Sequence, residues 1–250
     1  MAYTTQELSA RTFRDFAALA VQQGECWCIF YQRPRPVGRG LSGEARSALN
    51  RKDKEAMVRG GRSHAILVYD GKTPIGWCQY GKREELPRID ARRTYREVAP
   101  PDDTETLWRI TCFFVARSYR GKGVAKFALR AALESIRRQG GGTVEAFPVV
   151  SEKMAAVPEW RWFGTLGMFR REGFKTLAPL GTSGALVRKR IAPYPATTSR
   201  ETLIRRPSTQ RSRAGRSAGR SLSWHGRGRG FKSHPVHYST ASGQDPIMHE

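Results

Sequence analysis

Long apolar runs are missing from this sequence. A membrane-spanning helix needs about 18 to 20 consecutive apolar residues, and no stretch of the 250-residue chain approaches that length. The first residues, MAYTTQELSARTFRDF, also lack the apolar core of a secretory signal peptide. We therefore expect a protein that stays in the cytoplasm and does not enter a membrane.

Cysteine is scarce, with four residues in the chain: Cys26, Cys28, Cys78 and Cys112. Without a secretion signal, four cysteines in a chain of this size do not indicate a disulfide framework. The stretch CWCIFY (26–31) is typical of a strand, with Cys26 and Cys28 on one face. No histidine stands at ligand spacing from them, so we expect buried, reduced thiols and no metal site.

Acidic residues are half as frequent as basic ones. The chain has 44 Lys and Arg against 22 Asp and Glu, a net charge of +22 and a pI of about 10.7. From Pro195 onward ten basic residues face three acidic ones, which accounts for +7 and leaves +15 for the first 194 residues. Such a charge favours anionic partners, whether phosphorylated ligands, nucleic acid or an acidic surface.

Hydrophobic periodicity predicts a mixed order of helices and strands up to about Ile191. The N-terminus reads as a helix start, with Thr4 as N-cap and Glu7 completing a capping box. The other expected elements follow in chain order: a strand at 26–31, a helix at 42–59, a hairpin at 64–80, a strand at 106–115, a helix at 124–139, a strand at 143–150, a short helix at 165–172 and an antiparallel pair at 174–180 and 184–191. The strand–helix–strand order in the middle implies a right-handed crossover and a parallel pair.

A glycine-rich turn separates the apolar strand at 106–115 from the amphipathic helix that begins at Val124. In the stretch VARSYRGKGVAK (115–126), Gly121 and Gly123 let the backbone approach a ligand, and Arg117, Arg120 and Lys122 add positive charge. Free N–H groups at the start of a helix, together with its dipole, bind phosphate. The turn matches neither the Walker A pattern nor the dinucleotide-binding fingerprint. A phosphate-binding turn is one interpretation, and a plain glycine turn with solvated charges is the other.

The same turn resembles the signature of a known family. RGKGVA (120–125) is similar to the Arg/Gln-x-x-Gly-x-Gly/Ala signature of the GNAT superfamily of N-acetyltransferases, and MFRREGF (168–174) is similar to a later motif of that family. Together with CWC, GWCQYGKREELPRI, WRITCFFVARSYRGKGVA and VEAFPV, these stretches resemble a bacterial GNAT subgroup that is usually left functionally unassigned. The resemblance spans about residues 5–191.

The resemblance implies a mixed α/β fold. We expect the GNAT arrangement, a central mixed sheet of about six to seven strands with a splayed parallel pair and flanking helices. The acetyltransferase domain would comprise residues 1–193, followed by a basic tail at 194–250.

The resemblance also implies where acetyl-CoA is bound and what the protein does with it. Backbone groups of Phe113, Phe114 and Val115 would pair with the pantetheine along the central strand. The pyrophosphate would be held by the signature residues Arg120, Gly121, Lys122, Gly123, Val124 and Ala125. The implied reaction moves an acetyl group to a primary amine of a small molecule or peptide, by direct attack of the amine on the thioester.

Glu145 is the candidate for the general base of that reaction. In VEAF it occupies a strand position at which some members of the family carry a catalytic glutamate. The alternative is a surface or ion-paired carboxylate, and Glu84, Glu85 and Asp90 are further candidates or substrate contacts. Cys112 suggests an acyl-cysteine route, but without a nearby histidine a buried core thiol is favoured.

Phe169 departs from the family's pattern, in which many members carry a tyrosine as proton donor to the leaving thiolate. Phenylalanine has no proton to donate, and Tyr80 and Tyr119 are the alternatives considered. Because the usual proton donor is missing, the sequence also allows a second interpretation, a CoA-binding protein that has lost catalytic activity.

The tail at 194–250 is rich in Ser, Arg and Gly, a composition that predicts disorder. Its interspersed Trp224, Phe231 and Tyr238 are compatible with weak nucleic-acid binding through charge and stacking. The stretch GFKSHP is also what a reading frame gives across the T-arm of a transfer-RNA gene. We favour the interpretation that the tail is translated read-through past the usual end of the domain, rather than a module kept for a function. No pattern in the chain indicates an oligomeric state.

Overall fold

The computed structural model describes residues 2–24, 26–101, 106–150 and 162–195. Its strands are β1 (Thr4–Glu7), β2 (His64–Asp70), β3 (Thr73–Lys82), β4 (Leu107–Val115), β5 (Gly142–Ala146), β6 (Lys175–Leu180) and β7 (Gly184–Ile191). Its α-helices are α1 (Phe13–Gln23), α2 (Gly43–Arg59), α3 (Arg93–Arg96), α4 (Val124–Arg138) and α6 (Leu166–Arg171). Short 3-10 turns are η1 (Phe30–Gln32), η2 (Arg83–Glu85) and η3 (Arg117–Tyr119).

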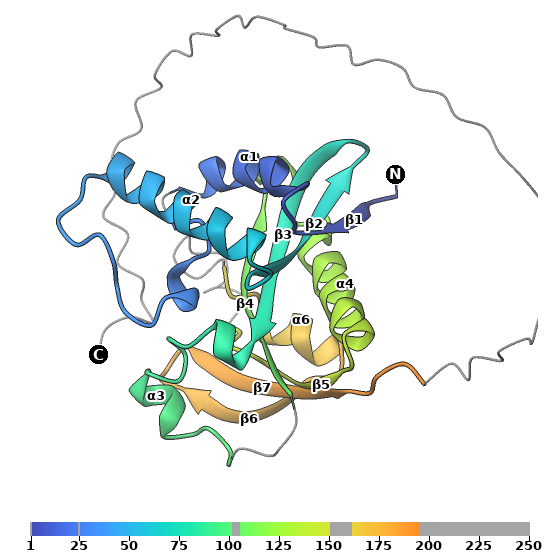
Figure 1. The fold of residues 1–250 in the computed structure, drawn as a ribbon. Coiled ribbons are helices and arrows are strands. Elements are labelled where there is room, and N and C mark those ends of the chain that lie inside the picture. The colour runs from blue at the N-terminus through green and yellow to red at the C-terminus, as the bar shows by residue number, and fades with distance from the viewer. Residues whose placement is uncertain (1, 25, 102–105, 151–161, 196–250) are drawn as a thin grey trace, which may run out of the picture. The chain divides into compact units, whose positions relative to one another are not determined.

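The described strands form one mixed sheet of seven strands in the order β1-β2-β3-β4-β5-β7-β6 (Figure 1). All neighbouring strands are antiparallel except β4 and β5, which run parallel and are joined through α4. This arrangement confirms the predicted mixed α/β fold with a central parallel pair.

The parallel pair stays together over only part of its length. Leu107–Ile110 of β4 pairs with Thr143–Ala146 of β5. β5 ends there, whereas β4 continues to Val115. The two strands therefore separate towards the carboxyl end of β4, as the prediction of a splayed pair requires.

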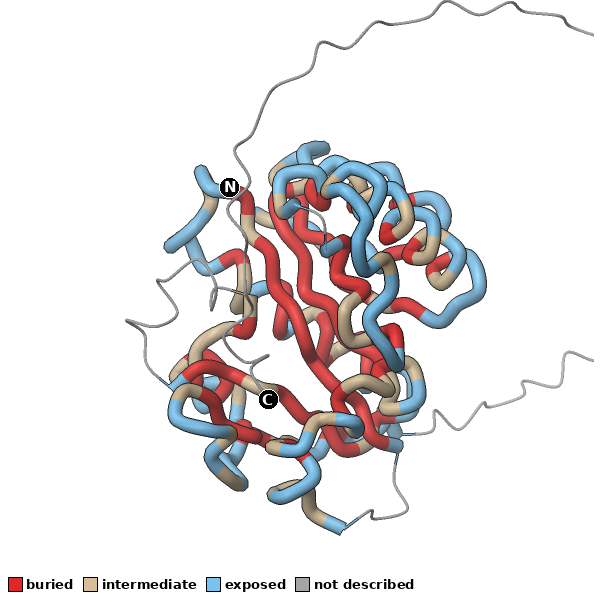
Figure 2. Tube along the Cα trace, turned by 90° about the vertical axis from the view of Figure 1, so that its left-hand side faces the viewer, coloured by how far each residue is buried: buried red, intermediate tan, exposed pale blue. Residues whose placement is uncertain are grey.

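Helices cover both faces of the sheet (Figure 1). On one face α4 buries Leu129 and Ile136 in a cluster that includes Phe113. On the other face α1 and α2 pack against Trp77 and Phe114. Figure 2 shows the central strands buried along most of their length. Burial on both faces explains why their sequences are continuous apolar runs rather than alternating ones.

A β-bulge in β4 changes which side chains face which helical layer. Gln79 of β3 pairs with Cys112 and Tyr80 pairs with Ile110, so Thr111 is an extra residue in β4. Ile110, before the bulge, faces the α4 layer. Cys112, two residues on, faces the α1 and α2 layer.

The N-terminus is a strand and not the predicted helix start. Thr4–Glu7 pairs with Ile66–Tyr69 of β2, and the first helix begins only at Phe13. The hydroxyl of Thr12 donates to the carbonyl of Glu7 at 2.9 Å, which fixes the turn between strand and helix. A local capping pattern contains no information about a free sheet edge, and pairing with that edge overrides it.

The CWC stretch is a turn and not the predicted strand. Residues 26–29 precede η1, and Trp27 and Cys28 have positive φ values of 52° and 50°. The amide of Ile29 donates to the carbonyl of Cys26 at 3.1 Å and closes the turn. Cys28 is buried and Cys26 is exposed, so the two thiols do not share a face. Among the described residues, no three His, Cys, Asp or Glu side chains are grouped to hold a metal ion.

The helix α2 begins after Ser42 as predicted. The hydroxyl of Ser42 accepts a hydrogen bond from the amide of Ala45 at 3.2 Å. Its buried residues are Asn50, Lys54 and Val58, spaced four apart. A fully buried lysine is rare in proteins, and here it brings a positive charge between α2 and the sheet.

Among the described helices, none has the length and apolar character needed to span a bilayer. The predicted basic tail at 194–250 lies outside the described residues from position 196 onward.

Candidate active site

The glycine turn lies between β4 and α4, at the end where the parallel pair separates. Gly121 and Gly123 have φ values of 75° and 79°, in the left-handed region that favours glycine. A Cβ atom built on either glycine meets nothing within 4 Å. Gly123 is the N-cap of α4 and makes no side-chain capping bond. The positive end of the helix dipole therefore faces open space.

The predicted phosphate-binding residues are brought together on this turn. Arg120, Gly121, Lys122 and Gly123 are exposed, while Val124 is buried and anchors the start of α4. Ala125 follows Val124 in the first turn of the helix and is half-buried. The turn thus offers backbone N–H groups and two cations to solvent from a fixed base.

Two basic side chains lie against the turn itself. The Nε of Arg120 donates to the carbonyl of Val115 at 3.1 Å, which ties the turn back to the end of β4. The Nζ of Lys122 lies 5.3 Å from the centre of the Tyr119 ring. Both contacts keep positive charge close to the uncapped helix end.

The separating edge of β4 is in contact with Trp162. The N–H of Phe113 donates to the carbonyl of Trp162 at 2.7 Å. The indole of Trp162 stacks on Phe114, with ring centres 6.1 Å apart and planes at 13°. Phe113, Phe114 and Val115 lie at the same end of β4 as the turn, and Trp162 engages the first of these backbone groups.

Glu145 lies on β5 inside a buried ion-pair network. It is fully buried and stands beside Arg109 of β4 and Arg188 of β7 in the sheet register. Its Oε1 accepts from Nε of Arg188 at 2.9 Å. Its Oε2 accepts from the hydroxyl of Tyr95 at 2.8 Å and from Nε of Arg109 at 3.5 Å. Both carboxylate oxygens have partners, and the network joins three adjacent strands.

Of the other candidate acids, Asp90 belongs to the same network. Asp90 accepts two hydrogen bonds from the guanidinium of Arg109, at 2.8 and 2.7 Å. Partial burial raises the pKa of Asp90, but the hydrogen bonds and charge of Arg109 outweigh burial and hold this pKa below its usual value. Glu85 contacts His64 at 3.1 Å, and Glu84 is exposed on η2.

Phe169 is a core residue of α6. It is fully buried, and its ring packs edge-on against Phe113 at 6.0 Å and Phe174 at 5.1 Å. Tyr80, one of the alternative proton donors, is buried with its hydroxyl against α4, and burial raises its pKa to about 12. The hydroxyl of Tyr119 donates to the carboxylate of Asp70, the last residue of β2, at 3.1 Å.

Sequence reasoning missed a buried polar cluster between α2 and the sheet. The Nζ of Lys54 donates to the side-chain oxygens of Gln32 and Gln79, at 2.8 and 2.9 Å. Burial lowers the pKa of Lys54 to about 8, and neighbouring thiols offset this only in part. The cluster extends to Cys28 and Cys112, whose Sγ atoms are 2.8 Å apart. A lysine on a surface helix ordinarily faces water, so no sequence signal marks this one.

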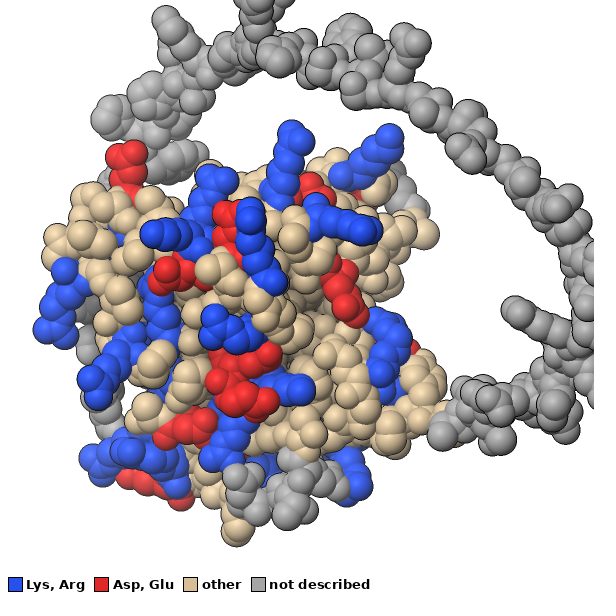
Figure 3. All heavy atoms as spheres, in the orientation of Figure 1, with Lys and Arg blue, Asp and Glu red and all other residues tan. Residues whose placement is uncertain are grey.

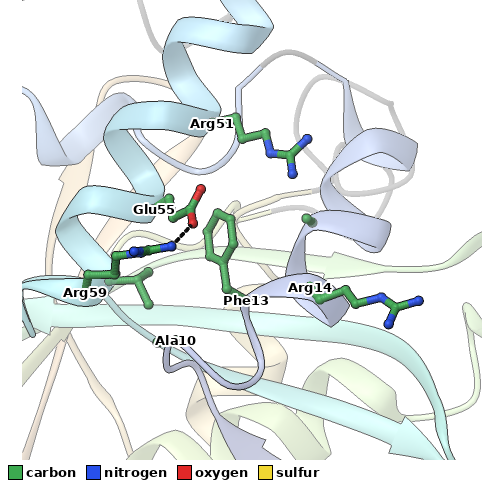
Figure 4. Close-up of a pocket in the computed structure, with 8 residues that line it drawn as sticks. Ala10, Phe13, Arg14, Arg51, Glu55 and Arg59 are labelled. Atoms are coloured by element: carbon green, nitrogen blue, oxygen red, sulfur yellow. Dashed lines mark hydrogen bonds and ion pairs between the residues drawn. The ribbon is translucent and has the colours of Figure 1, made fainter. Parts of the chain in front are cut away.

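A hollow of about 280 Å³ lies between α1 and α2 (Figure 4). Arg14, Arg51 and the ion pair of Arg59 with Glu55 surround the ring of Phe13 there. Its lining comes from α1, α2 and the residues just before α1, with no contribution from β4 or α4. This hollow is separate from the glycine turn.

Basic side chains are spread over the face of the protein drawn in Figure 3, with acidic side chains between them. Some are paired with acids, as in the contact of Arg93 with Glu97 at 2.8 Å. On this face the positive charge forms no single continuous stripe of the kind that tracks a nucleic-acid backbone.

The sequence matches the family model described as "Acetyltransferase (GNAT) family" over residues 31–164, more than half of the chain. No curated protein matches it. Similar solved structures include one described as "histone acetyltransferase HPA2 and related acetyltransferase" from Corynebacterium glutamicum, at 18% identity and a TM-score of 0.45, covering 78% of this chain and 99% of that one. Another is the paia N-acetyltransferase of Thermoplasma acidophilum in complex with coenzyme A, at 12% identity and a TM-score of 0.43, covering 76% and 99%.

The ribosomal-protein-S18-alanine N-acetyltransferase of Escherichia coli is also similar, at 10% identity and a TM-score of 0.42, covering 78% of this chain and 98% of that one. At these values the likeness to individual structures supports no conclusion about substrate. The family model and the observed topology agree with each other: the chain belongs to the GNAT family of acetyltransferases.

Proposed function

We propose that the protein transfers the acetyl group of acetyl-CoA to a primary amine of a small molecule or peptide. The observation that carries this proposal is the turn at 120–125, where two left-handed glycines open into free space before the uncapped start of α4. Such a helix end binds phosphate. It adjoins the backbone of 113–115 on the separating edge of β4, and membership of the GNAT family supports acetyl transfer.

The chain's own residues fit acetyl-CoA at its phosphate end. Gly121 and Gly123 leave the space in front of α4 free, and Lys122 supplies a cation beside it. Acetyl-CoA supplies the activated acyl group, as a thioester. On β4, we expect the N–H of Phe113 to be a donor to the pantetheine or the thioester carbonyl. In the structure this N–H donates to Trp162, so binding along β4 requires Trp162 to release it.

Calorimetric titration with acetyl-CoA tests the turn. Gly123→Glu places a negative carboxylate where the phosphates are proposed to lie, and should weaken binding at least about tenfold through charge repulsion alone. The matched control is Gly61→Glu, because Gly61 also has a positive φ, of 67°, and open surroundings, at the end of α2. Wild type that does not bind acetyl-CoA, or equal weakening by both substitutions, would refute the proposed site.

Glu145 remains our proposed base, in competition with a structural role. Its two oxygens are occupied by Arg109, Arg188 and Tyr95, so an amine proton would have to replace one of these bonds. Glu145→Gln keeps the shape and removes the charge. We expect a lower kcat with an unchanged affinity for acetyl-CoA. A lower melting temperature with a normal kcat would assign Glu145 to the fold alone.

A CoA-binding protein without catalysis is the second candidate, and the apolar surroundings of Phe169 favour it, because they offer no hydroxyl at the place where many members carry the proton donor. Incubation with a panel of amines, followed by chromatographic measurement of released CoA and mass detection of acetylated amine, separates the two. Binding without product across the panel supports this second candidate. Acetylated product excludes it.

We further propose that residues 1–193 contain the whole acetyltransferase domain and that the tail at 194–250 is dispensable for it. A chain that stops after residue 195 should then bind acetyl-CoA with the affinity of the full chain. A marked loss of affinity on truncation would contradict this division. Nucleic-acid binding through the tail would show as an affinity that falls steeply with added salt.

A further inference from the structure

Two cysteines from distant parts of the chain meet beneath α2. Cys28 precedes η1 and Cys112 lies on β4, 84 positions apart, and their Sγ atoms are 2.8 Å from each other. A disulfide bond is about 2.05 Å long, so the two sulfur atoms need to approach by only about 0.8 Å. The backbone at Trp27 and Cys28 is held in the left-handed region, which is sparsely populated outside glycine and is often retained at functional sites.

The surroundings of Cys28 suit a thiolate. Its Sγ receives the indole N–H of Trp77 at 3.2 Å and lies 3.7 Å from the amide nitrogen of Gln23. The Nζ of Lys54 lies 3.5 Å from the carbonyl oxygen of Cys28. Donors from α1 and β3 thus reach this thiol, and the cation of α2 contacts the backbone carbonyl of the same residue.

Lys54 has no acidic partner within ion-pair distance among the described residues. Its hydrogen bonds go to the neutral oxygens of Gln32, Gln79 and Cys28. A buried cation without a counter-charge is costly. The groups nearby that become negative on losing a proton are the thiols. Among them, Cys28 accepts a hydrogen bond from the indole N–H of Trp77, and its backbone carbonyl is the group that Lys54 contacts.

We propose that Cys28 and Cys112 form a redox-active dithiol, in which the positive charge of Lys54 beside Cys28 favours the Cys28 thiolate and hydrogen peroxide is the oxidant. The Cys28 thiolate attacks one peroxide oxygen, the O–O bond breaks, and the departing hydroxide takes up a proton to become water. The Cys112 thiol then attacks the resulting sulfenic sulfur. The S–S bond forms and a second water leaves, so that two thiols and one hydrogen peroxide give one disulfide and two waters.

The pKa values of the two thiols divide the roles in the same way. Burial raises the pKa of Cys28, but the hydrogen bond with Cys112, the charge of Lys54 and the bond from Trp77 together lower it below its usual value. The hydrogen bond to Cys28 and burial both raise the pKa of Cys112 well above its usual value. Cys28 is therefore the attacking group and Cys112 the resolving one.

Thiol counting on the full chain tests the dithiol. The reduced protein is treated with excess hydrogen peroxide at neutral pH, then denatured and alkylated, and its non-reduced peptides are mapped by mass spectrometry. We expect two of the four thiols to be lost and a single cross-linked peptide pair containing Cys28 and Cys112. Cys112→Ala should give no cross-link and a trappable sulfenic acid on Cys28.

Two further variants set the controls. Cys78→Ala removes a buried thiol of the opposite layer and should oxidise like wild type. Lys54→Met should slow disulfide formation at least about tenfold at neutral pH, because less Cys28 is thiolate without the cation. If this variant does not fold, two others still test the dithiol. Cys26→Ala should keep the cross-link between Cys28 and Cys112, and Cys112→Ala should abolish it.

Four thiols that survive excess peroxide would overturn the proposal, as would a cross-link that pairs Cys28 with Cys26 or Cys78. An unchanged oxidation rate in folded Lys54→Met would overturn the role of the lysine. These readouts need no acetyl-CoA, so they stand or fall separately from the proposed acetyl transfer.

Discussion

Replacing Lys54 by methionine tests how much a buried ammonium group costs this fold. Lys54 is fully buried, and burial lowers its pKa from the usual 10.5 to about 8. One pKa unit corresponds to about 1.4 kcal/mol. Keeping this lysine charged in the folded protein at neutral pH therefore costs about 3 kcal/mol.

The sign of the pH dependence follows from proton binding. Between about pH 8 and 10 the unfolded chain holds the lysine proton and the folded chain releases it, so the free energy of unfolding rises with pH in that window. Below pH 8 the cost is fully present. We expect wild type to gain about 2–3 kcal/mol relative to Lys54→Met between pH 7 and pH 10. The lowered pKa of Cys28 also makes the free energy of unfolding of wild type rise with pH, and the variant, which lacks the charge of Lys54, loses part of this gain.

The variant should be close to wild type in stability at pH 7. Methionine removes the charge but leaves the side-chain oxygen of Gln79 without the bond from Lys54, a loss of about 1–3 kcal/mol. Gln32 keeps a bond from Ser63 at 3.2 Å. The two effects nearly cancel at pH 7, and only the loss remains at pH 10.

Urea unfolding followed by circular dichroism, in the presence of a reductant, measures the difference at each pH. The raised pKa of Cys78 acts on both proteins alike and cancels in the comparison. Lys52→Met, an exposed neighbour on the same helix, is the control and should show no pH-dependent difference from wild type. A constant difference between wild type and Lys54→Met from pH 7 to pH 10 would refute the reasoning.

Three further predictions concern the sheet and a helix start. Gly76→Ala places a Cβ 2.5 Å from the carbonyl oxygen of Phe114, so β3 and β4 must shift. The free energy of unfolding in urea should fall by about 1–3 kcal/mol, and an unchanged midpoint would contradict the close packing. Asp90 stabilises the fold above pH 4 or so through Arg109, and this contribution is lost as the pH falls through its lowered pKa. Asp90→Asn should therefore flatten acid unfolding, whereas an identical acid slope would count against the pair. Ser42→Ala removes the N-cap of α2 and should cost about 1 kcal/mol in the same urea assay, and no change would show that solvent satisfies this helix end equally well.

The central part of the fold follows from the sequence because its signals are local. The strand, glycine turn and helix at 107–138 are contiguous, and their apolar spacing and glycines define them without reference to the rest of the chain. The crossover rule then makes β4 and β5 parallel. The strand at Thr4–Glu7 was missed because its partner edge, at Ile66–Tyr69, lies far away in sequence. The turn at 26–29 was missed because two non-glycine residues adopt positive φ values there.

The candidate site likewise has a part that local sequence predicts and a part that depends on contacts between distant segments. Phe113 and the signature turn lie together because only a few residues separate them along the chain. The partners of Glu145 are set by the register of three strands, which places Arg109 and Arg188 on either side of it. Lys54 reaches the backbone of Cys28 only through the packing of α2 on the sheet. Neither the partners of Glu145 nor the surroundings of Lys54 produce a residue spacing that can be recognised in the sequence.

The bulge at Thr111 has a consequence for reading any relative of this chain. Without the extra residue, Ile110 and Cys112 would point to the same layer, and the thiol would lie under α4, away from Cys28. The buried hydroxyl of Thr111 has no hydrogen-bond partner among the described residues, so its own side chain does little to keep it there. One residue inserted or deleted at this point exchanges the α4 layer for the α1 and α2 layer along the rest of the strand. A sequence alignment that misplaces a single gap here would assign every following side chain, Phe113 included, to the wrong side of the sheet.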